Sequence, residues 1–363
     1  MENNMHLSSS PHFTKGLTTQ KTMAAVLIAL LPECIAGIVF FGLKALITIT
    51  VSVISCVFFE WLFQKVTKQK IVISNLSAAV TGVMLALVCP PSIPWWMIII
   101  GAAVAIIVAK GLFGGIGSNV FNPALTGRAV LFLSFPAVMG ANWLLPKVGA
   151  GSVNNLVQNS LSSADAVSSA TVLTGLKAGT VQSIDYLQYF IGSNTGCIGE
   201  TSVLLILISF IFLLLIKVID WRAPTGMIGT LCVCSFLYGL FTGGSCSVAF
   251  NEVMISLLTG GVAFGACFMV TDYATTPVTK PGRLVFGVGC GLITFLIRKF
   301  GGYPEGVMFS ILIMNSIAPF LNNLRIRMYG YGKKGNQRAD ISKISMEFDL
   351  NNSRLRESEN DKQ

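Results

Sequence analysis

The chain has 363 residues and an amino-acid composition unlike that of a water-soluble protein. Hydrophobic residues make up 53% of it, charged residues make up 11%, and the mean hydropathy is +0.71. Because soluble domains carry roughly 25% charged residues, a water-soluble fold is not expected. The formal net charge of +9 fits membrane topology and attraction to anionic lipid, so membrane lipid is an expected partner and nucleic acid is not.

Apolar runs recur along the chain, each of about 17 to 22 residues, which is enough to cross a hydrocarbon core of ~30 Å. They predict an all-α polytopic membrane protein with about ten transmembrane helices. The expected spans are 22–41, 44–63, 71–89, 94–109, 124–140, 201–219, 226–243, 254–271, 282–297 and 304–321. The polar stretch ahead of the first span argues against a cleaved signal peptide.

Five predicted spans precede the polar segment 141–200 and five follow it, so the second half would enter the membrane from the opposite side. The predicted organisation is an N-terminal tail (1–21), a five-helix half (22–140), the polar segment (141–200), a second and inverted five-helix half (201–321) and a mobile tail (322–363). A weak repeat places Gly114-Gly115 after the fourth span and Gly301-Gly302 after the ninth. Paired breaks are typical of interrupted helices in transport folds, and ordinary loops explain them equally well.

The basic residues predict the orientation of the chain in the membrane. With the N-terminus in the cytoplasm, Arg128 and most other basic residues lie on the inner side. Of all 25 basic residues, the outer side receives five, which are Lys44, Lys147, Lys177, Arg298 and Lys299. Since cytoplasmic loops carry an excess of Lys and Arg, both termini are expected inside and segment 141–200 outside the cytoplasm.

Acidic residues in or near the spans are scarce, and each is a candidate for an ion pathway. Glu33 follows Pro32 inside the first span, Asp272 ends the eighth, and Glu305 follows the second Gly-Gly break. Interface, capping or subunit-contact roles explain these three equally well. Glu60 is expected to form a surface ion pair with the basic loop that begins at Lys65. No metal site is expected, because Cys232 and Cys234 point in different directions on a helix.

A short pattern in segment 141–200 carries a family resemblance. Asp165 is followed by Ser168, Ser169, Ala170 and Thr171, an Asp-x-x-Ser-[Gly/Ser]-Ala-Thr arrangement. It resembles the flavinylation motif of the NqrB/RnfD family, although Ser169 replaces the more usual glycine and Val172 the frequent proline. Three other stretches agree with the resemblance, which are Ser10-Pro11-His12 with Ala29-Leu30-Leu31-Pro32, the run from Phe113 to Ala124, and the run from Thr271 to Pro277.

The resemblance implies two flavins. In the family a flavin transferase joins FMN through a phosphoester to the motif threonine, which is Thr171 here. The Gly-rich stretch 113–124 is similar to the place where the family holds a non-covalent riboflavin, and Asn119 and Asn122 would face its ring. The residues themselves leave a second interpretation open, in which Asn122 caps a helix that begins at Pro123.

The short N-terminal tail favours the D-type member of the Rnf complex within this family. That resemblance implies a membrane subunit of an ion-translocating ferredoxin:NAD oxidoreductase in a bacterial or archaeal cell membrane. The subunit would carry electrons through its flavins, coupled to Na⁺ or H⁺ movement, and would have no catalytic residue of its own. Its partners would be the Rnf subunits of the A, B, C, E and G types. Two alternatives stay open: a solute channel or secondary transporter without a redox role, and a structural subunit that has lost its flavin.

Overall fold

The computed structural model describes residues 18–141, 144, 146, 186–192, 195–303 and 305–322. All regular structure in these residues is helical. The first part of the chain contains α1 Thr19–Phe41, α2 Leu43–Val66, η1 Ile73–Asn75, α3 Ser77–Leu87, α4 Trp95–Ala103, η2 Val104–Gly111, α5 Pro123–Ser134 and α6 Pro136–Ala141. The second part contains α9 Tyr186–Ile191, η3 Ile198–Glu200, α10 Val203–Leu215, α11 Arg222–Gly243, α12 Cys246–Leu258, α13 Val262–Phe264, η4 Gly265–Met269, α14 Lys280–Phe300 and α15 Val307–Leu321.

The all-helical polytopic fold class is confirmed, and a helix lies in every range predicted as a span. By length and composition, α1, α2 and α11 are each able to cross a membrane alone. A fourth candidate is the pair formed by α12 and Val262–Met269, whose two parts are bent by 65°. Shorter apolar helices, α3, α4 with η2, α10 and α15, accompany them.

The exposed surface of α1 shows why this fold needs lipid. Ile28, Leu31 and Ile35 are more than half exposed, whereas Glu33 and Gly37 face the protein interior and are buried. A soluble protein turns its large apolar side chains inward. Here they face outward at helical spacing, which fits a hydrocarbon environment around α1.

Several predicted spans differ from the structure in form. α3 has 11 residues and α5 has 12, so each is shorter than the ~20 residues of a full crossing. The single span 124–140 is broken at Phe135, because Pro136 begins a new helix and disfavours helical geometry in the residue before it. The span 254–271 is broken between Leu258 and Val262, where Gly260 has a φ of +69°.

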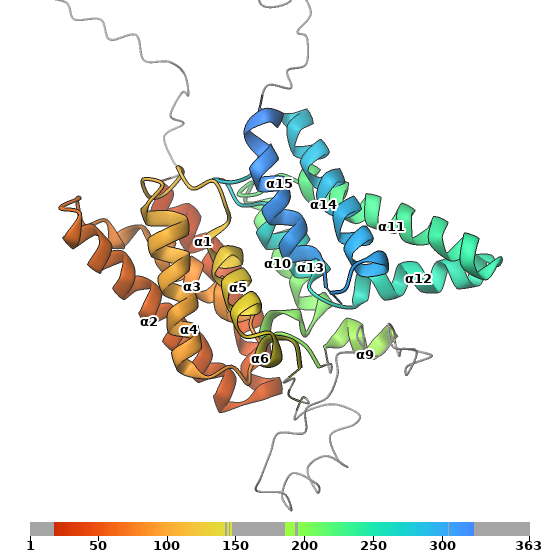
Figure 1. The fold of residues 1–363 in the computed structure, drawn as a ribbon, viewed down its shortest axis with the longest axis horizontal. Helices are drawn as coiled ribbons and strands as arrows, with labels where there is room; N and C mark the ends of the chain where they lie inside the picture. Colours follow the sequence, from red (N-terminus) through yellow and green to blue (C-terminus); the bar gives the residue numbers. More distant parts are fainter. Residues whose placement is uncertain are drawn as a thin grey trace, which may run out of the picture. The chain divides into compact units, whose positions relative to one another are not determined.

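The helices pack in a pattern that occurs twice along the chain. In the first half α2 contacts α3 and α4, and η2 contacts α5; in the second half α11 contacts α12 and α14, and α14 contacts α15. Figure 1 shows the first group in red to yellow and the second in green to blue. Helices α1 and α10 pack against each other, and α5 contacts α15. These contacts bring the start of α5, the Gly260 break and the loop before α15 together.

Candidate functional site

A cavity of about 170 Å³ is built from segments of both halves of the chain. Its walls are mainly apolar, and its polar lining comes from α3, the end of η2, the segment before α5 and the segment after η4. The lining side chains used below are Ser77, Thr81, Lys110, Asn119, Asn122 and Asp272. An apolar pocket with a few convergent polar groups is the usual form of a small-molecule site.

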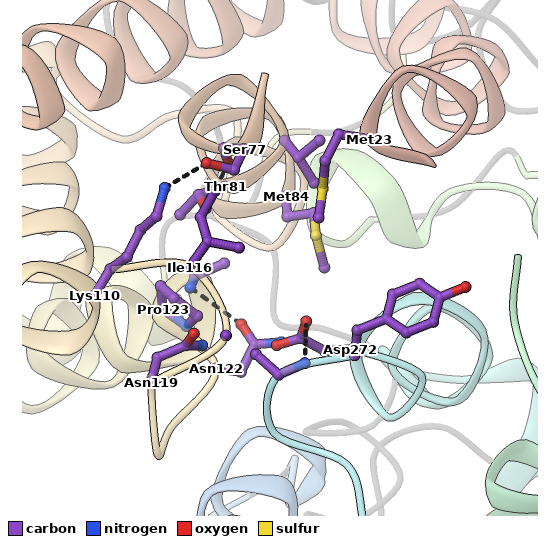
Figure 2. Close-up of a pocket in the computed structure, with 15 residues that line it drawn as sticks. Met23, Ser77, Thr81, Met84, Lys110, Ile116, Asn119, Asn122, Pro123 and Asp272 are labelled. Carbon is purple, nitrogen blue, oxygen red and sulfur yellow. Dashed lines mark hydrogen bonds between the residues drawn. The ribbon is translucent and has the colours of Figure 1, made fainter. Parts of the chain in front are cut away.

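Asn119 and Asn122 lie at this cavity, as Figure 2 shows, and both are buried. The Asn122 Oδ1 atom accepts hydrogen bonds from the backbone N–H groups of Ala124 (3.1 Å) and Leu125 (3.3 Å), so Asn122 caps α5 as the capping interpretation predicted. The Asn119 amide nitrogen donates to the Phe121 carbonyl at 3.3 Å. Within the described part of the chain, the Asn122 amide nitrogen and the Asn119 amide oxygen are left for a ligand.

The glycine-rich segment lets the backbone turn back toward the cavity. Gly114 has a φ of +103° and Gly117 a φ of +86°, which side-chain-bearing residues rarely adopt. Gly117 lines the cavity, and a methyl group placed on it would meet no atom within 4 Å. The segment therefore depends on glycine for its backbone conformation and leaves open space where side chains would otherwise stand.

Lys110 is a charged residue of this site that the sequence motifs did not identify. Its Nζ atom donates to Glu60 Oε1 at 2.7 Å and to Ser77 Oγ at 2.6 Å. The prediction of a surface pair between Glu60 and the loop at Lys65 is wrong, because Glu60 is only 5% exposed and pairs with Lys110. A charged residue inside an apolar helix was the signal that could have identified Lys110.

Asp272 lies on the far side of Asn122 from Lys110 in Figure 2. Its carboxylate accepts from the Ala274 N–H (3.4 Å) and the Thr275 hydroxyl (3.2 Å). Burial raises the pKa of Asp272, and these two hydrogen bonds only partly oppose it. The hydrogen bonds hold the turn after η4, so Asp272 has a local structural role and also lines the cavity.

Asp220, in the connection between α10 and α11, anchors the same turn indirectly. It pairs with Arg222 and with Arg283, both at 2.9 Å, and the Arg283 Nε atom donates to the Pro277 carbonyl at 2.9 Å. Burial opposes ionisation of Asp220, but hydrogen bonds from Arg283 and Arg222 outweigh it and lower the pKa. The turn that carries Asp272 is thus tied to the start of α14.

A second group of buried charges lies where the two halves meet. Arg128 of α5 donates to Glu305 at 2.9 Å and lies 3.9 Å from Glu200. The other Glu305 oxygen accepts from the Gly261 N–H at 3.0 Å. A methyl group on Gly261 would stand 2.5 Å from Glu200 and 2.6 Å from Glu305. The break between α12 and α13 therefore fits between two carboxylates.

Two arginines of this region do not belong in the count of basic residues that predicts the orientation of the chain in the membrane. Arg128 was counted on the inner side and Arg298 on the outer side, yet both are buried and both interact with Glu305. Arg298 also donates to the carbonyls of Ser256 (2.8 Å) and Thr259 (3.0 Å). Neither arginine is a loop residue that reports orientation, and removing one from each side leaves the excess on the inner side.

The predicted site residues thus fall into separate places. Asn119, Asn122 and Asp272 meet at the cavity, whereas Glu305 belongs to the Arg128 group. Glu33 is fully buried in α1, and neither of its oxygens has a hydrogen-bond partner among the described residues. The flavinylation pattern lies outside the described residues, with Asp165, Ser168, Ser169, Ala170 and Thr171.

Comparisons with known proteins cover nearly the whole chain. A sequence model of the NQR2, RnfD, RnfE family matches residues 6–330. A protein of Acetobacterium woodii, named as the D component of a Na(+)-translocating ferredoxin:NAD(+) oxidoreductase complex, is 40% identical over 92% of this chain and 97% of its own length. One of Clostridium ljungdahlii, named as the D component of a proton-translocating ferredoxin:NAD(+) oxidoreductase complex, is 38% identical over 87% of this chain and 93% of its own length.

A third relative comes from Salmonella arizonae and is named as the D component of an ion-translocating oxidoreductase complex. It is 36% identical over 90% of this chain and 99% of its own length. The family match spans both halves, the cavity segments and the pattern around Thr171. On these grounds, the chain belongs to the NQR2, RnfD, RnfE family.

Proposed function

We propose that this chain is the D-type membrane subunit of an Rnf-type ion-translocating ferredoxin:NAD oxidoreductase, active only within the assembled complex. The observation that carries the proposal is the 40% identity, over nearly the full length of both chains, to a relative with that name. Partner subunits of the A, B, C, E and G types and a flavin transferase complete the proposed system. Both termini lie in the cytoplasm and segment 141–200 lies outside it.

The proposed covalent cofactor is FMN on Thr171. A threonine hydroxyl can form a phosphoester, and the small neighbours Ser169 and Ala170 give a transferase access to it. The supporting pattern contains Asp165 and Ser168 and lies within the range that the family match covers. A tethered FMN would supply electron transfer without loss of the cofactor to solvent.

The proposed second cofactor is riboflavin in the cavity. The residues present fit such a group, because the walls are mainly apolar and the polar atoms that have no protein partner among the described residues suit a flat, hydrogen-bonding ring. The Asn122 amide nitrogen can donate and the Asn119 amide oxygen can accept. Lys110 also lines the cavity and is held in place by Glu60 and Ser77. A bound flavin would accept and release electrons at this place.

The test is mass spectrometry of the segment around Thr171 in chain produced with an active flavin transferase. No Lys or Arg stands between Lys147 and Lys177, so trypsin releases residues 148–177 as one peptide. We expect the mass of FMN on this peptide and fluorescence of the protein band on a denaturing gel. Thr171→Ala should remove both, and Thr171→Ser tests whether any hydroxyl is sufficient.

Three outcomes would count against the proposal. Absence of the FMN mass, with the transferase shown to modify a known substrate in the same cells, would show that the chain carries no covalent FMN at this segment. A Thr171→Ala complex that transfers electrons from ferredoxin to NAD at the wild-type rate would show that FMN on Thr171 has no role in this electron transfer. Solute transport by the chain alone, unaffected by Thr171→Ala, would favour the transporter alternative.

A further inference from the structure

Glu33 is a carboxyl group that the proposed flavin sites do not use. It lies in the middle of α1, directly after Pro32, and has an exposed fraction of 0%. Neither of its carboxylate oxygens has a hydrogen-bond partner within the described part of the chain. Because Glu33 is covered by this chain itself, a basic side chain of another subunit cannot reach it from the surface.

Among the described residues, the neighbours of Glu33 offer it no positive charge. α1 packs against α2, α3, α10, η1 and η3, whose buried carboxyl groups, Glu60 and Glu200, face Lys110 and Arg128. No lysine or arginine among the described residues forms an ion pair with Glu33. The titratable groups that interact with its charge are the thiols of Cys34 and Cys267.

The surrounding backbone has polar groups to offer. Proline at position 32 has no N–H, so the carbonyl of Ile28, one turn earlier, lacks its usual helical donor. Cys267 belongs to η4, a π-helix, and such segments frequently occur at functional sites. On α10, which packs against α1, the buried Ser209 hydroxyl also has no hydrogen-bond partner among the described residues.

An isolated carboxylate in apolar surroundings is so unfavourable that the group neutralises itself. It does so by holding a proton or by binding a cation whose charge compensates its own. A permanently inert position would be filled more stably by an apolar residue of similar volume. A buried carboxyl group with no fixed protein partner is therefore suited to binding a proton or a cation and releasing it again.

We propose that Glu33 is a binding site for a monovalent cation, either a proton or a sodium ion, that is taken up and released during ion translocation. This inference rests on the proposed function and names a residue for its ion-carrying step. If the ion is Na⁺, its binding to the carboxylate releases the carboxyl proton, so one positive charge replaces another. If the ion is H⁺, the proton itself binds and leaves. Relatives named for Na⁺ and for protons are almost equally similar, so the experiment distinguishes the two ions.

The first experiment uses dicyclohexylcarbodiimide, which adds to protonated carboxyl groups in apolar surroundings and forms a stable N-acylurea. The full chain in lipid vesicles is treated across a pH series in NaCl or in choline chloride, and the modified peptides are identified by mass spectrometry. We expect label on Glu33 that decreases as the pH rises. With Na⁺ at ten times its dissociation constant, labelling should slow roughly tenfold if Na⁺ is the ion, and Na⁺ should have no effect if the ion is a proton.

Glu252 is the matched control for this labelling, because it is partly exposed and pairs with Lys299. It should react much less than Glu33. Absence of label on Glu33, in samples whose denatured form does become labelled there, would overturn the inference.

The second experiment replaces Glu33 in the complete complex in sealed vesicles. Glu33→Gln keeps the size of the side chain and removes its charge, so we expect covalent flavin on Thr171 to remain while ion uptake per electron falls at least roughly tenfold, the change expected when an essential ligand is lost. Glu33→Asp should restore part of the uptake, and Glu252→Gln should leave it unchanged.

Wild-type uptake per electron by Glu33→Gln would overturn the inference and leave the proposed function standing. A wild-type complex that moves no electrons from ferredoxin to NAD would overturn the proposed function, while the labelling result would stand on its own.

Discussion

The buried charged residues differ in how completely their neighbours compensate them. Lys110 and Glu60 form a close pair through one Glu60 oxygen, and Ser77 also accepts from Lys110, whereas the other Glu60 oxygen has no hydrogen-bond partner among the described residues. Arg128 binds Glu305 closely, and Glu200 lies at 3.9 Å from it. Glu33 has no partner of either kind among the described residues. Because the cost of a mutation depends on what is left unpaired, these positions should respond differently to substitution.

Removing one member of the Lys110–Glu60 pair should be much more harmful than removing both. Lys110→Met leaves the Glu60 carboxylate buried without a cation, which should cost about 3–5 kcal/mol of folding stability. The double variant Lys110→Met with Glu60→Gln should recover most of this loss. Thermal unfolding of the detergent-purified protein measures both. As a control, Lys299→Met breaks a partly exposed pair with Glu252 and should cost less than about 1 kcal/mol.

Replacement of Asn122 can separate its capping role from the proposed riboflavin contact. Asn122→Ser keeps an oxygen that caps α5, so stability should change by less than about 0.5 kcal/mol, whereas Asn122→Ala should cost about 1 kcal/mol. Both variants lose the amide nitrogen, so both should lose extractable riboflavin while the covalent flavin remains. Full riboflavin content in Asn122→Ser would show that the amide does not hold the ligand.

The acid sensitivity of the chain should depend in part on Asp220. Its pKa in the folded protein is lowered, because hydrogen bonds from Arg283 and Arg222 outweigh burial. The stabilisation from ionised Asp220 is therefore complete above its unfolded pKa, near 3.9, and is lost as the pH falls through the lower folded value. The difference in unfolding temperature between wild type and Asp220→Asn should be constant above about pH 5 and shrink below about pH 4. A difference that grows on acidification would contradict this.

At the scale of elements, the helix breaks are the features that shape the molecule. α12 and α13 are separated at Gly260 and Gly261, and the two parts differ in direction by 65°. The backbone N–H of Gly261 is not used by a helix and donates to Glu305. A break in a helix thus provides a hydrogen bond to a buried carboxylate.

A methyl group at Gly261 should disturb this break. Since the added carbon would stand within 2.6 Å of both Glu200 and Glu305, Gly261→Ala should destabilise the protein by about 1–3 kcal/mol. Gly229→Ala is the matched control, because a methyl group there meets nothing within 4 Å inside α11. The control should be neutral or stabilise by up to about 1 kcal/mol. Equal shifts of the two unfolding temperatures would contradict the steric argument.

Apolar periodicity and length predicted where helices occur, because a membrane imposes both on the sequence. The same signals could not predict the ion pairs, since Lys110 and Glu60 are 50 residues apart and Arg128 and Glu305 are 177 apart. Hydropathy also treats a broken helix as one apolar run, which is why the bend at Gly260 was missed. Asn122 was predictable as a cap because Pro123 follows it directly, whereas its approach to Asp272 depends on tertiary packing.

At the scale of the whole molecule, the proposed orientation can be tested with reporter fusions. Alkaline phosphatase, which is active only outside the cytoplasm, should be active when fused after Lys177. Green fluorescent protein, which folds in the cytoplasm, should fluoresce when fused after Gln363. The physical reason is the excess of basic residues on the inner side, which persists when Arg128 and Arg298 are left out. The opposite pattern at either position would contradict the proposed orientation.

The cavity also constrains the order of events during biosynthesis. Asn122 and Asp272 both line it, yet Asp272 follows Asn122 by 150 residues. At a synthesis rate of about 5–20 residues per second, the ribosome needs roughly 8 to 30 s to cover that interval. During this time the first half stands in the membrane with one wall of its cavity absent. A ligand that needs both walls can enter only after the second half has been inserted, so loading of the cavity is a late step of assembly.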